Sequence, residues 1–200
     1  LVVIEPCPAE LELLQRAVAG VSGVLARRLG YPAADAAAIA RAGSLHDIGM
    51  ALLLQNVAAD GRVGPNERHL ARKHCPWGEE ILSLAGPDYA LAAQVALQHH
   101  ERWDGRGYPL GLKEDEISMP ARIVAVAAGY VSARMRDGPG DGFPFAGTES
   151  RRPDVGAFDP RILSACLDSQ ETLSAEVERS LQSRPERANP CNCLIGDAFL

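Results

Sequence analysis

The chain has 200 residues, of which 46% are hydrophobic and 23% are charged, a balance that predicts one soluble domain with a sizeable core. Twenty Lys and Arg residues against 26 Asp and Glu residues give a net charge of −6, which excludes a broadly basic surface for a nucleic acid polymer. No run of about 18 apolar residues predicts a membrane span, and the N-terminus lacks the basic start of a signal peptide. The five cysteines form no C-x-x-C pair, which argues against a disulfide framework and favours the reducing cytoplasm.

Hydrophobic residues recur three to four positions apart along most of the chain, which is the spacing of amphipathic helices. Glycine and proline mark the breaks between them, and the glycine-rich residues 102–116 predict an ordered loop. A second loop is predicted over 137–158 and a tail from 185 onward. The fold class is therefore predicted to be all-α, with helices over 9–29, 33–45, 66–84, 89–100 and 120–134, and short helices near 160–168 and 170–183.

Histidines are the chemically informative residues of this chain. Four of the five lie in three short groups, namely His46 followed by Asp47, then His74, then the pair His99-His100. Imidazole and carboxylate ligands brought from separate helices suit iron, manganese or zinc. Adjacent residues on a helix diverge by about 100°, so the histidine pair can converge on one ion only where its helix ends.

The sequence around these histidines resembles the HD-GYP family, a branch of the HD superfamily of metal-dependent phosphohydrolases. The strings that carry the resemblance are SLHDIG at 44–49, HCPWGEEIL at 74–82, QHHERWDGRGYPLGL at 98–112 and MPARIVAVA at 119–127. The resemblance covers residues 10–168, so we expect an N-terminal lead over 1–9, the domain over 10–168, and a C-terminal helix and tail over 169–200.

The resemblance implies an HD-domain helical bundle that acts on or binds cyclic di-GMP in bacterial-type signal transduction. It implies a catalytic role for His46 and Asp47, with Asp47 bridging two metal positions. It also implies that the loop around Gly107, Tyr108 and Pro109 contacts the ligand or docks on a GGDEF-type domain. Arg102, Arg106 and Arg122 are candidate local cations, and Arg122 is the one we expect to bind ligand. The metal ligands implied by the resemblance are His46, Asp47, His74, His99 and His100.

This sequence departs from the family pattern at three positions to which the resemblance assigns a chemical role. The first-helix histidine falls on Leu14, the aspartate after the A-R-I-V-A-x-A stretch falls on Ala128, and the lysine after H-D-I-G is Met50. Two protein ligands are too few for a tight transition-metal site, which usually has three or more. We therefore expect one divalent metal ion, held by Asp47, His74, His99 and His100, with a second position that keeps only His46 and a share of Asp47.

Two functions follow from this pattern. The first is a binding module that holds a metal ion and a cyclic dinucleotide or partner protein with little or no turnover, because each lost charge-stabilising group typically costs about 10²–10³ in rate. The second is an active metal-dependent phosphodiesterase, which requires a substitute ligand such as Glu12, Glu101 or Asp104. A purely structural role would leave the histidine groups unexplained.

Overall fold

The computed structural model describes residues 9–52, 72–137 and 155–182. These residues form helices and no strand, which confirms the all-α class. The helices are α1 (Ala9–Arg28), α2 (Ala33–Leu45), α5 (His74–Leu84), α6 (Ala90–Gln98), α7 (Met119–Asp137), α8 (Pro160–Leu167) and α9 (Gln170–Gln182), with 3₁₀ turns η1 (Pro87–Tyr89), η2 (Glu114–Glu116) and η3 (Val155–Ala157).

The ends of the predicted helices agree with these bounds to within a few residues, except at the start of one helix. The helix predicted over 66–84 is described only from His74, and its first residues, with His69, lie outside the described part of the chain. The helix predicted from 120 extends to Asp137. The middle of the predicted 137–158 loop and the predicted tail also lie outside the described residues.

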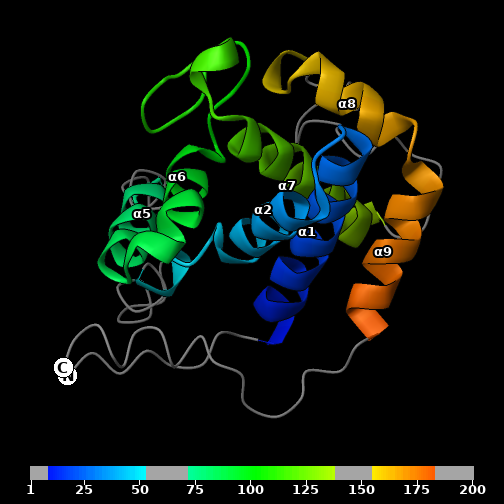
Figure 1. The fold of residues 1–200 in the computed structure, drawn as a ribbon, viewed down its shortest axis with the longest axis horizontal. Coiled ribbons are helices and arrows are strands. Elements are labelled where there is room, and N and C mark those ends of the chain that lie inside the picture. Colours follow the sequence, from blue (N-terminus) through cyan, green and yellow to red (C-terminus); the bar gives the residue numbers. More distant parts are fainter. Residues whose placement is uncertain (1–8, 53–71, 138–154, 183–200) are drawn as a thin grey trace.

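Helix α1 lies at the centre of the bundle because its apolar stripe meets three other helices. Val18, Val21 and Leu25 are at most 1% exposed, and α1 packs against α2, α7 and α9. Figure 1 shows α9 along one side of α1, with α2 leading to the α5–α6 pair on the other. The bundle thereby brings the end of α2, the start of α5 and the end of α6 into one region.

Small side chains let α6 approach its neighbours closely. Ala92, Ala93 and Ala96 are buried, and α6 packs against both α2 and α5. At the end of α2, Gly49 lies so near α5 that a Cβ atom on it would come 2.7 Å from the backbone nitrogen of Gly78. Only glycine fits this approach, which sets the residues after α2 against the first turn of α5.

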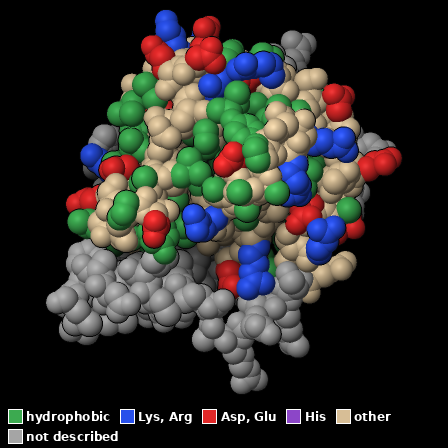
Figure 2. Space-filling model, viewed as in Figure 1, with side chains coloured by type: hydrophobic (Ala, Val, Ile, Leu, Met, Phe, Trp, Pro, Cys, Tyr) green, Lys and Arg blue, Asp and Glu red, His purple; other side chains and the backbone are tan. Residues whose placement is uncertain are grey.

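On the face of the molecule seen in Figure 2, acidic and basic side chains are interspersed around hydrophobic ones, so this face has no continuous basic patch. Among the described residues, no helix combines the length and the apolar character that crossing a membrane requires.

Candidate metal centre

The predicted metal ligands converge because each lies at the end of a helix. Helix α2 stops at Leu45 and His46 caps it, while His74 is the first residue of α5. Helix α6 stops at Gln98, so His99 caps it and His100 lies beyond it. This helix end is the condition under which neighbouring histidines can turn toward one ion.

The carboxylate of Asp47 lies at the middle of the cluster. Its Oδ2 is 3.2 Å from His46 Nε2, and its Oδ1 is 3.3 Å from His74 Nε2 and 3.2 Å from His99 Nε2. The Nε2 atoms of His74 and His99 are themselves 3.2 Å apart. Residues from three helix ends therefore direct nitrogen and oxygen atoms at one small volume.

Backbone hydrogen bonds determine which imidazole nitrogens face this volume. His46 Nδ1 donates to the carbonyl oxygen of Gly43 at 2.7 Å, and His99 Nδ1 donates to that of Ala96 at 2.9 Å. At His99, whose pKa is lowered by burial, the neutral ring therefore presents Nε2 as a bare lone pair that faces the Asp47 carboxylate. Such a lone pair and a carboxylate oxygen repel each other unless a cation lies between them. Metal-binding histidines typically donate their other ring N–H to a carbonyl oxygen, as His46 and His99 do here. The donor set therefore fits a divalent metal ion.

The protonation states also suit metal binding. Burial by itself raises the pKa of Asp47, but the charge and hydrogen bonds of the neighbouring histidines outweigh burial and hold that pKa well below its usual range. Burial lowers the pKa of His99, and it lowers the pKa of His100 to about 2 with help from the charges of His99 and His74. At His46, the charge of Asp47 outweighs burial and raises the pKa. At neutral pH the cluster thus offers an ionised carboxylate and at least two neutral imidazoles, which are the forms that bind metals.

His100 is additionally held by the loop that follows it. Its ring stacks on Tyr108 with centroids 4.7 Å apart and planes 17° apart. The guanidinium carbon of Arg72 lies 5.0 Å from the centre of the same tyrosine ring. Gly107 permits this approach, because a Cβ atom there would come 2.6 Å from the carbonyl oxygen of His100. The loop residue Tyr108 therefore orients a histidine of the cluster.

A pocket of about 470 Å³ opens beside the cluster, a volume typical of small-molecule sites. Leu14 from α1 and Ala128 from α7 line it together with His46 and Asp47. Leu14 and Ala128 are the two positions at which the sequence was expected to lack a metal ligand, and both present apolar side chains to this pocket. The pocket wall also includes Arg72, Arg102, Arg106, Gly107 and Tyr108.

None of the three acidic side chains considered as substitute ligands is directed at the second position. Glu12 accepts a hydrogen bond from Arg16 at 2.7 Å, and Asp104 pairs with Arg102 at 2.6 Å. Glu101 lines the pocket, but both of its carboxylate oxygens accept backbone N–H groups of residues 110–112.

Two residues expected to bind ligand lie outside the pocket wall. Pro109 is exposed and absent from the lining. Arg122 is buried, donates to Asp159 at 2.9 Å and to Asp115 at 2.8 Å, and lies over the ring of Trp103. Through these contacts Arg122 joins α7 to the start of α8.

Two residues near the cluster were not among the predicted site residues. Arg72 lines the pocket, and Cys75 places its sulfur 3.4 Å from His74 Nε2. Cys75 follows His74 in the first turn of α5 and Arg72 lies two residues before His74, so closeness in sequence to His74 was the available signal.

Comparison with known proteins agrees with this architecture. The HD domain family matches residues 4–142. A cyclic di-GMP phosphodiesterase of Pseudomonas aeruginosa is 37% identical over 74% of this chain and 36% of its own length. A cyclic di-GMP phosphodiesterase of Thermotoga maritima is 40% identical over 56% of this chain and 31% of its own, and a 3′3′-cGAMP-specific phosphodiesterase of Vibrio cholerae is 38% identical over 55% and 24%.

Among solved structures, a cyclic GMP-AMP-specific phosphodiesterase of Vibrio cholerae superposes with a TM-score of 0.56 at 14% identity, covering 88% of this chain and 53% of that one. This likeness concerns the fold. The chain spans about a third or less of the length of the three curated relatives named above. The match over most of the chain, together with the histidine-aspartate cluster, shows that this protein belongs to the HD domain family.

Proposed function

We propose that this domain is a degenerate HD-GYP domain of cyclic di-GMP signalling, which holds one divalent metal ion and binds a cyclic dinucleotide with little or no turnover. Asp47, His74, His99 and His100 would hold the ion, which supplies positive charge for a phosphate group. The observation that carries the proposal is the pair of apolar side chains, Leu14 and Ala128, in the pocket wall beside His46 and Asp47.

The pocket wall suits a cyclic dinucleotide. Arg72 and Arg106 provide cations for its phosphates, while Phe158 provides apolar surface for its bases. Burial raises the pKa of Tyr108 above its ordinary value, so the hydroxyl stays protonated as a hydrogen-bond donor. The names of the relatives, which are phosphodiesterases of cyclic di-GMP or 3′3′-cGAMP, support this ligand class.

Metal analysis and calorimetry test the proposal together. We expect one equivalent of iron, manganese or zinc per chain after anaerobic loading, and a binding heat with cyclic di-GMP or 3′3′-cGAMP. The variant Asp47→Ala should lose the metal, whereas Asp35→Ala, which replaces an exposed aspartate on α2, should retain it. Absence of both metal and binding heat in the unchanged protein would refute the proposal.

The alternative function is an active metal-dependent phosphodiesterase, which the names of the relatives favour. It predicts two metal ions per chain and Fe(II)- or Mn(II)-dependent formation of a linear product from cyclic di-GMP, lost in Asp47→Ala. Docking of a GGDEF-type domain on the loop around Gly107 and Tyr108 is a separate part of the proposal, to be tested by co-purification with a purified GGDEF domain.

A further inference from the structure

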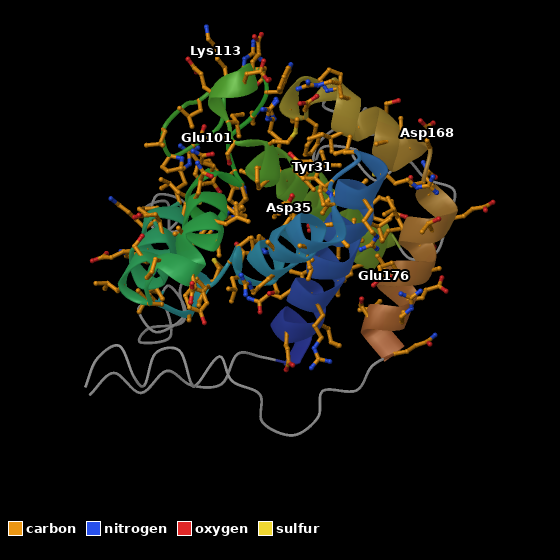
Figure 3. All side chains as sticks on the ribbon, in the orientation of Figure 1. Tyr31, Asp35, Glu101, Lys113, Asp168 and Glu176 are labelled. Carbon is orange, nitrogen blue, oxygen red and sulfur yellow. The ribbon has the colours of Figure 1, made fainter. Side chains whose placement is uncertain are left out.

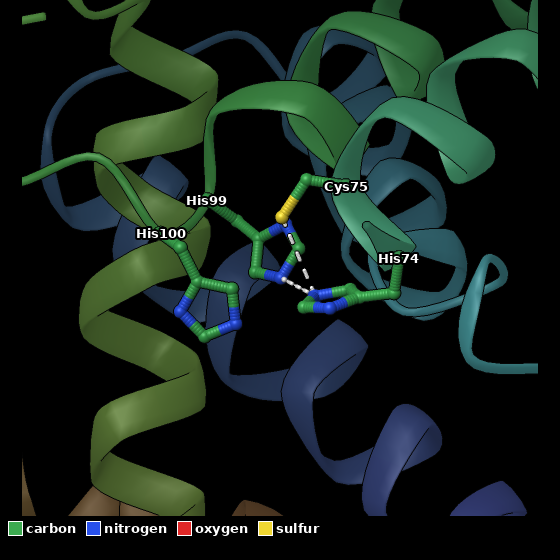
Figure 4. A group of neighbouring side chains, drawn as sticks. All are labelled: His74, Cys75, His99 and His100. Carbon is green, nitrogen blue, oxygen red and sulfur yellow. Dashed lines mark hydrogen bonds between the residues drawn. The ribbon is translucent and has the colours of Figure 1, made fainter. Parts of the chain in front are cut away.

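Cys75 is a buried thiol within the metal cluster. It follows His74 in the first turn of α5, and it is 0% exposed. Its Sγ lies 3.4 Å from His74 Nε2, the same nitrogen that faces Asp47 Oδ1 and His99 Nε2. Figure 4 shows the thiol and the imidazoles of His74 and His99 directed at one another, with His100 beside them.

The separations are those of ligands that share one ion. One ligand atom from each of His74, Cys75, His99 and His100 lies within 4.8 Å of the others. In a tetrahedral zinc site, with Zn–N near 2.1 Å and Zn–S near 2.3 Å, neighbouring ligand atoms are about 3.4–3.7 Å apart. The observed 3.4 Å between sulfur and His74 Nε2 and 3.2 Å between the two Nε2 atoms differ from this by a few tenths of an ångström at most.

A simple S–H···N hydrogen bond does not satisfy the thiol once an ion is bound. The lone pair of His74 Nε2 cannot both bind a metal and accept a proton from Cys75. Among the described residues, this nitrogen is the hydrogen-bond partner of the thiol. A bound ion therefore leaves Cys75 either as a buried thiol without its acceptor or as a ligand.

We propose that the Cys75 thiolate binds the same ion as His74, His99 and His100, as a ligand in addition to Asp47, and that it selects zinc over manganese. The proposal rests on the metal centre of the proposed function. As the metal–sulfur bond forms, the S–H bond breaks, its proton passes to water, and no electron is transferred. A thiolate is a soft ligand that suits zinc, whereas manganese prefers oxygen ligands.

Cobalt(II) loading under anaerobic conditions tests this ligand directly. Visible d–d bands report that cobalt is bound, and a near-ultraviolet charge-transfer band reports a thiolate ligand. We expect both in the unchanged protein, and in Cys75→Ser we expect the visible bands without the near-ultraviolet band. Cys166→Ser is the matched control, because Cys166 is also buried and free but lies in α8 outside the metal-binding groups.

Two further measurements complete the test. X-ray absorption of the unchanged zinc protein should show a sulfur shell near 2.3 Å, and this result does not depend on whether a variant folds. The affinity of Cys75→Ser for zinc should fall by at least about tenfold, with a smaller change for manganese.

The outcomes separate this proposal from the metal centre itself. Visible bands without the near-ultraviolet band in the unchanged protein, or a zinc shell of nitrogen and oxygen alone, would overturn the thiolate ligand and leave the metal centre standing. A near-ultraviolet band that survives Cys75→Ser would also overturn it. If no cobalt or zinc binds at all, the metal centre and the thiolate ligand both fail.

Discussion

The carboxylate of Glu101 accepts a hydrogen bond from the backbone N–H of Leu110 at 2.6 Å, across the loop that follows the histidine pair. The same carboxylate also accepts the N–H groups of Gly111 at 3.1 Å and Leu112 at 3.0 Å, and Glu101 is only 4% exposed. Figure 3 shows Glu101 at the base of this loop and Lys113 at its outer end. One buried carboxylate thereby fastens the loop that carries Tyr108.

Glu101→Gln should loosen this loop. The amide presents one oxygen and one NH₂ group where two oxygens now accept, so a loop N–H loses its partner and the free energy of unfolding should fall by about 2–3 kcal/mol. Urea unfolding measures this change, and calorimetry should show weaker binding of cyclic di-GMP. Glu80→Gln, at an exposed position of α5, should change stability by less than about 0.5 kcal/mol. Equal effects of the two substitutions would contradict the fastening role.

Leu14→His combined with Ala128→Asp should restore the second metal position. Both residues line the pocket beside His46 and Asp47, so the new imidazole and carboxylate would complete a four-ligand set. We expect the metal content to rise from one ion per chain to two, and hydrolysis of cyclic di-GMP to rise by about 10²–10³.

The matched control for this gain is Leu14→Gln with Ala128→Asn, which adds similar bulk and polarity without the imidazole and the carboxylate. Two ions in the unchanged protein would refute the one-metal proposal. A restored variant that still binds one ion would show that the two positions do not face the second site.

The sequence predicted those parts of the site that depend on local pattern. Each histidine group stands where a helical pattern stops, so the convergence of His99 and His100 on one centre follows from the end of α6. Leu14 and Ala128 stand at fixed offsets from the strings that carry the family resemblance, and both line the pocket.

Parts of the site that depend on distant partners could not be predicted in this way. Arg122 forms an ion pair with Asp159, which lies 37 positions away, and local spacing does not indicate this pairing. Likewise, nothing in the local spacing indicated that the ring of Tyr108 stacks on His100. Local spacing does not indicate which side chain elsewhere in the chain will form an ion pair with an arginine or stack on an aromatic ring.

Tyr108→Ala and Tyr108→Phe should separate the role of the ring from that of the hydroxyl. Removal of the ring frees His100, so we expect the zinc affinity of Tyr108→Ala to fall by about tenfold, as for other groups that orient a metal ligand. Tyr108→Phe keeps the stack and should retain zinc affinity, while its affinity for cyclic di-GMP falls through loss of the hydroxyl. Competition with a chelating dye measures the first effect and calorimetry the second. Equal zinc affinity in the two variants would rule out orientation by stacking.

Asp159→Asn should lower stability in a pH-dependent manner. Burial raises the pKa of Asp159, but hydrogen bonds from Arg161 and Arg122 outweigh burial and lower that pKa below its ordinary value of 3.8. The stabilisation is therefore complete above about pH 4 and is lost as the pH falls through the lowered folded-state pKa. Asparagine can still cap α8, so the substitution isolates the charge, and we expect a loss of about 2 kcal/mol at pH 6 that shrinks near pH 3.

Urea unfolding at the two pH values measures this difference. Asp168→Asn, at the other end of α8 (Figure 3), is the control, because Asp168 is exposed and its replacement should have little effect at either pH. A loss for Asp159→Asn that stays constant between pH 6 and pH 3 would argue against the charged pair.

The stack between His100 and Tyr108 connects a ligand of the proposed metal ion to a surface loop. Binding of the ion and the conformation of the loop would therefore be coupled. Thermodynamic linkage requires such a connection to act equally in both directions. A molecule that binds the loop more tightly when the proposed ion is present must raise the affinity of the domain for that ion by the same factor. With the proposed metal centre, the stack would thus make partner binding sensitive to the supply of metal.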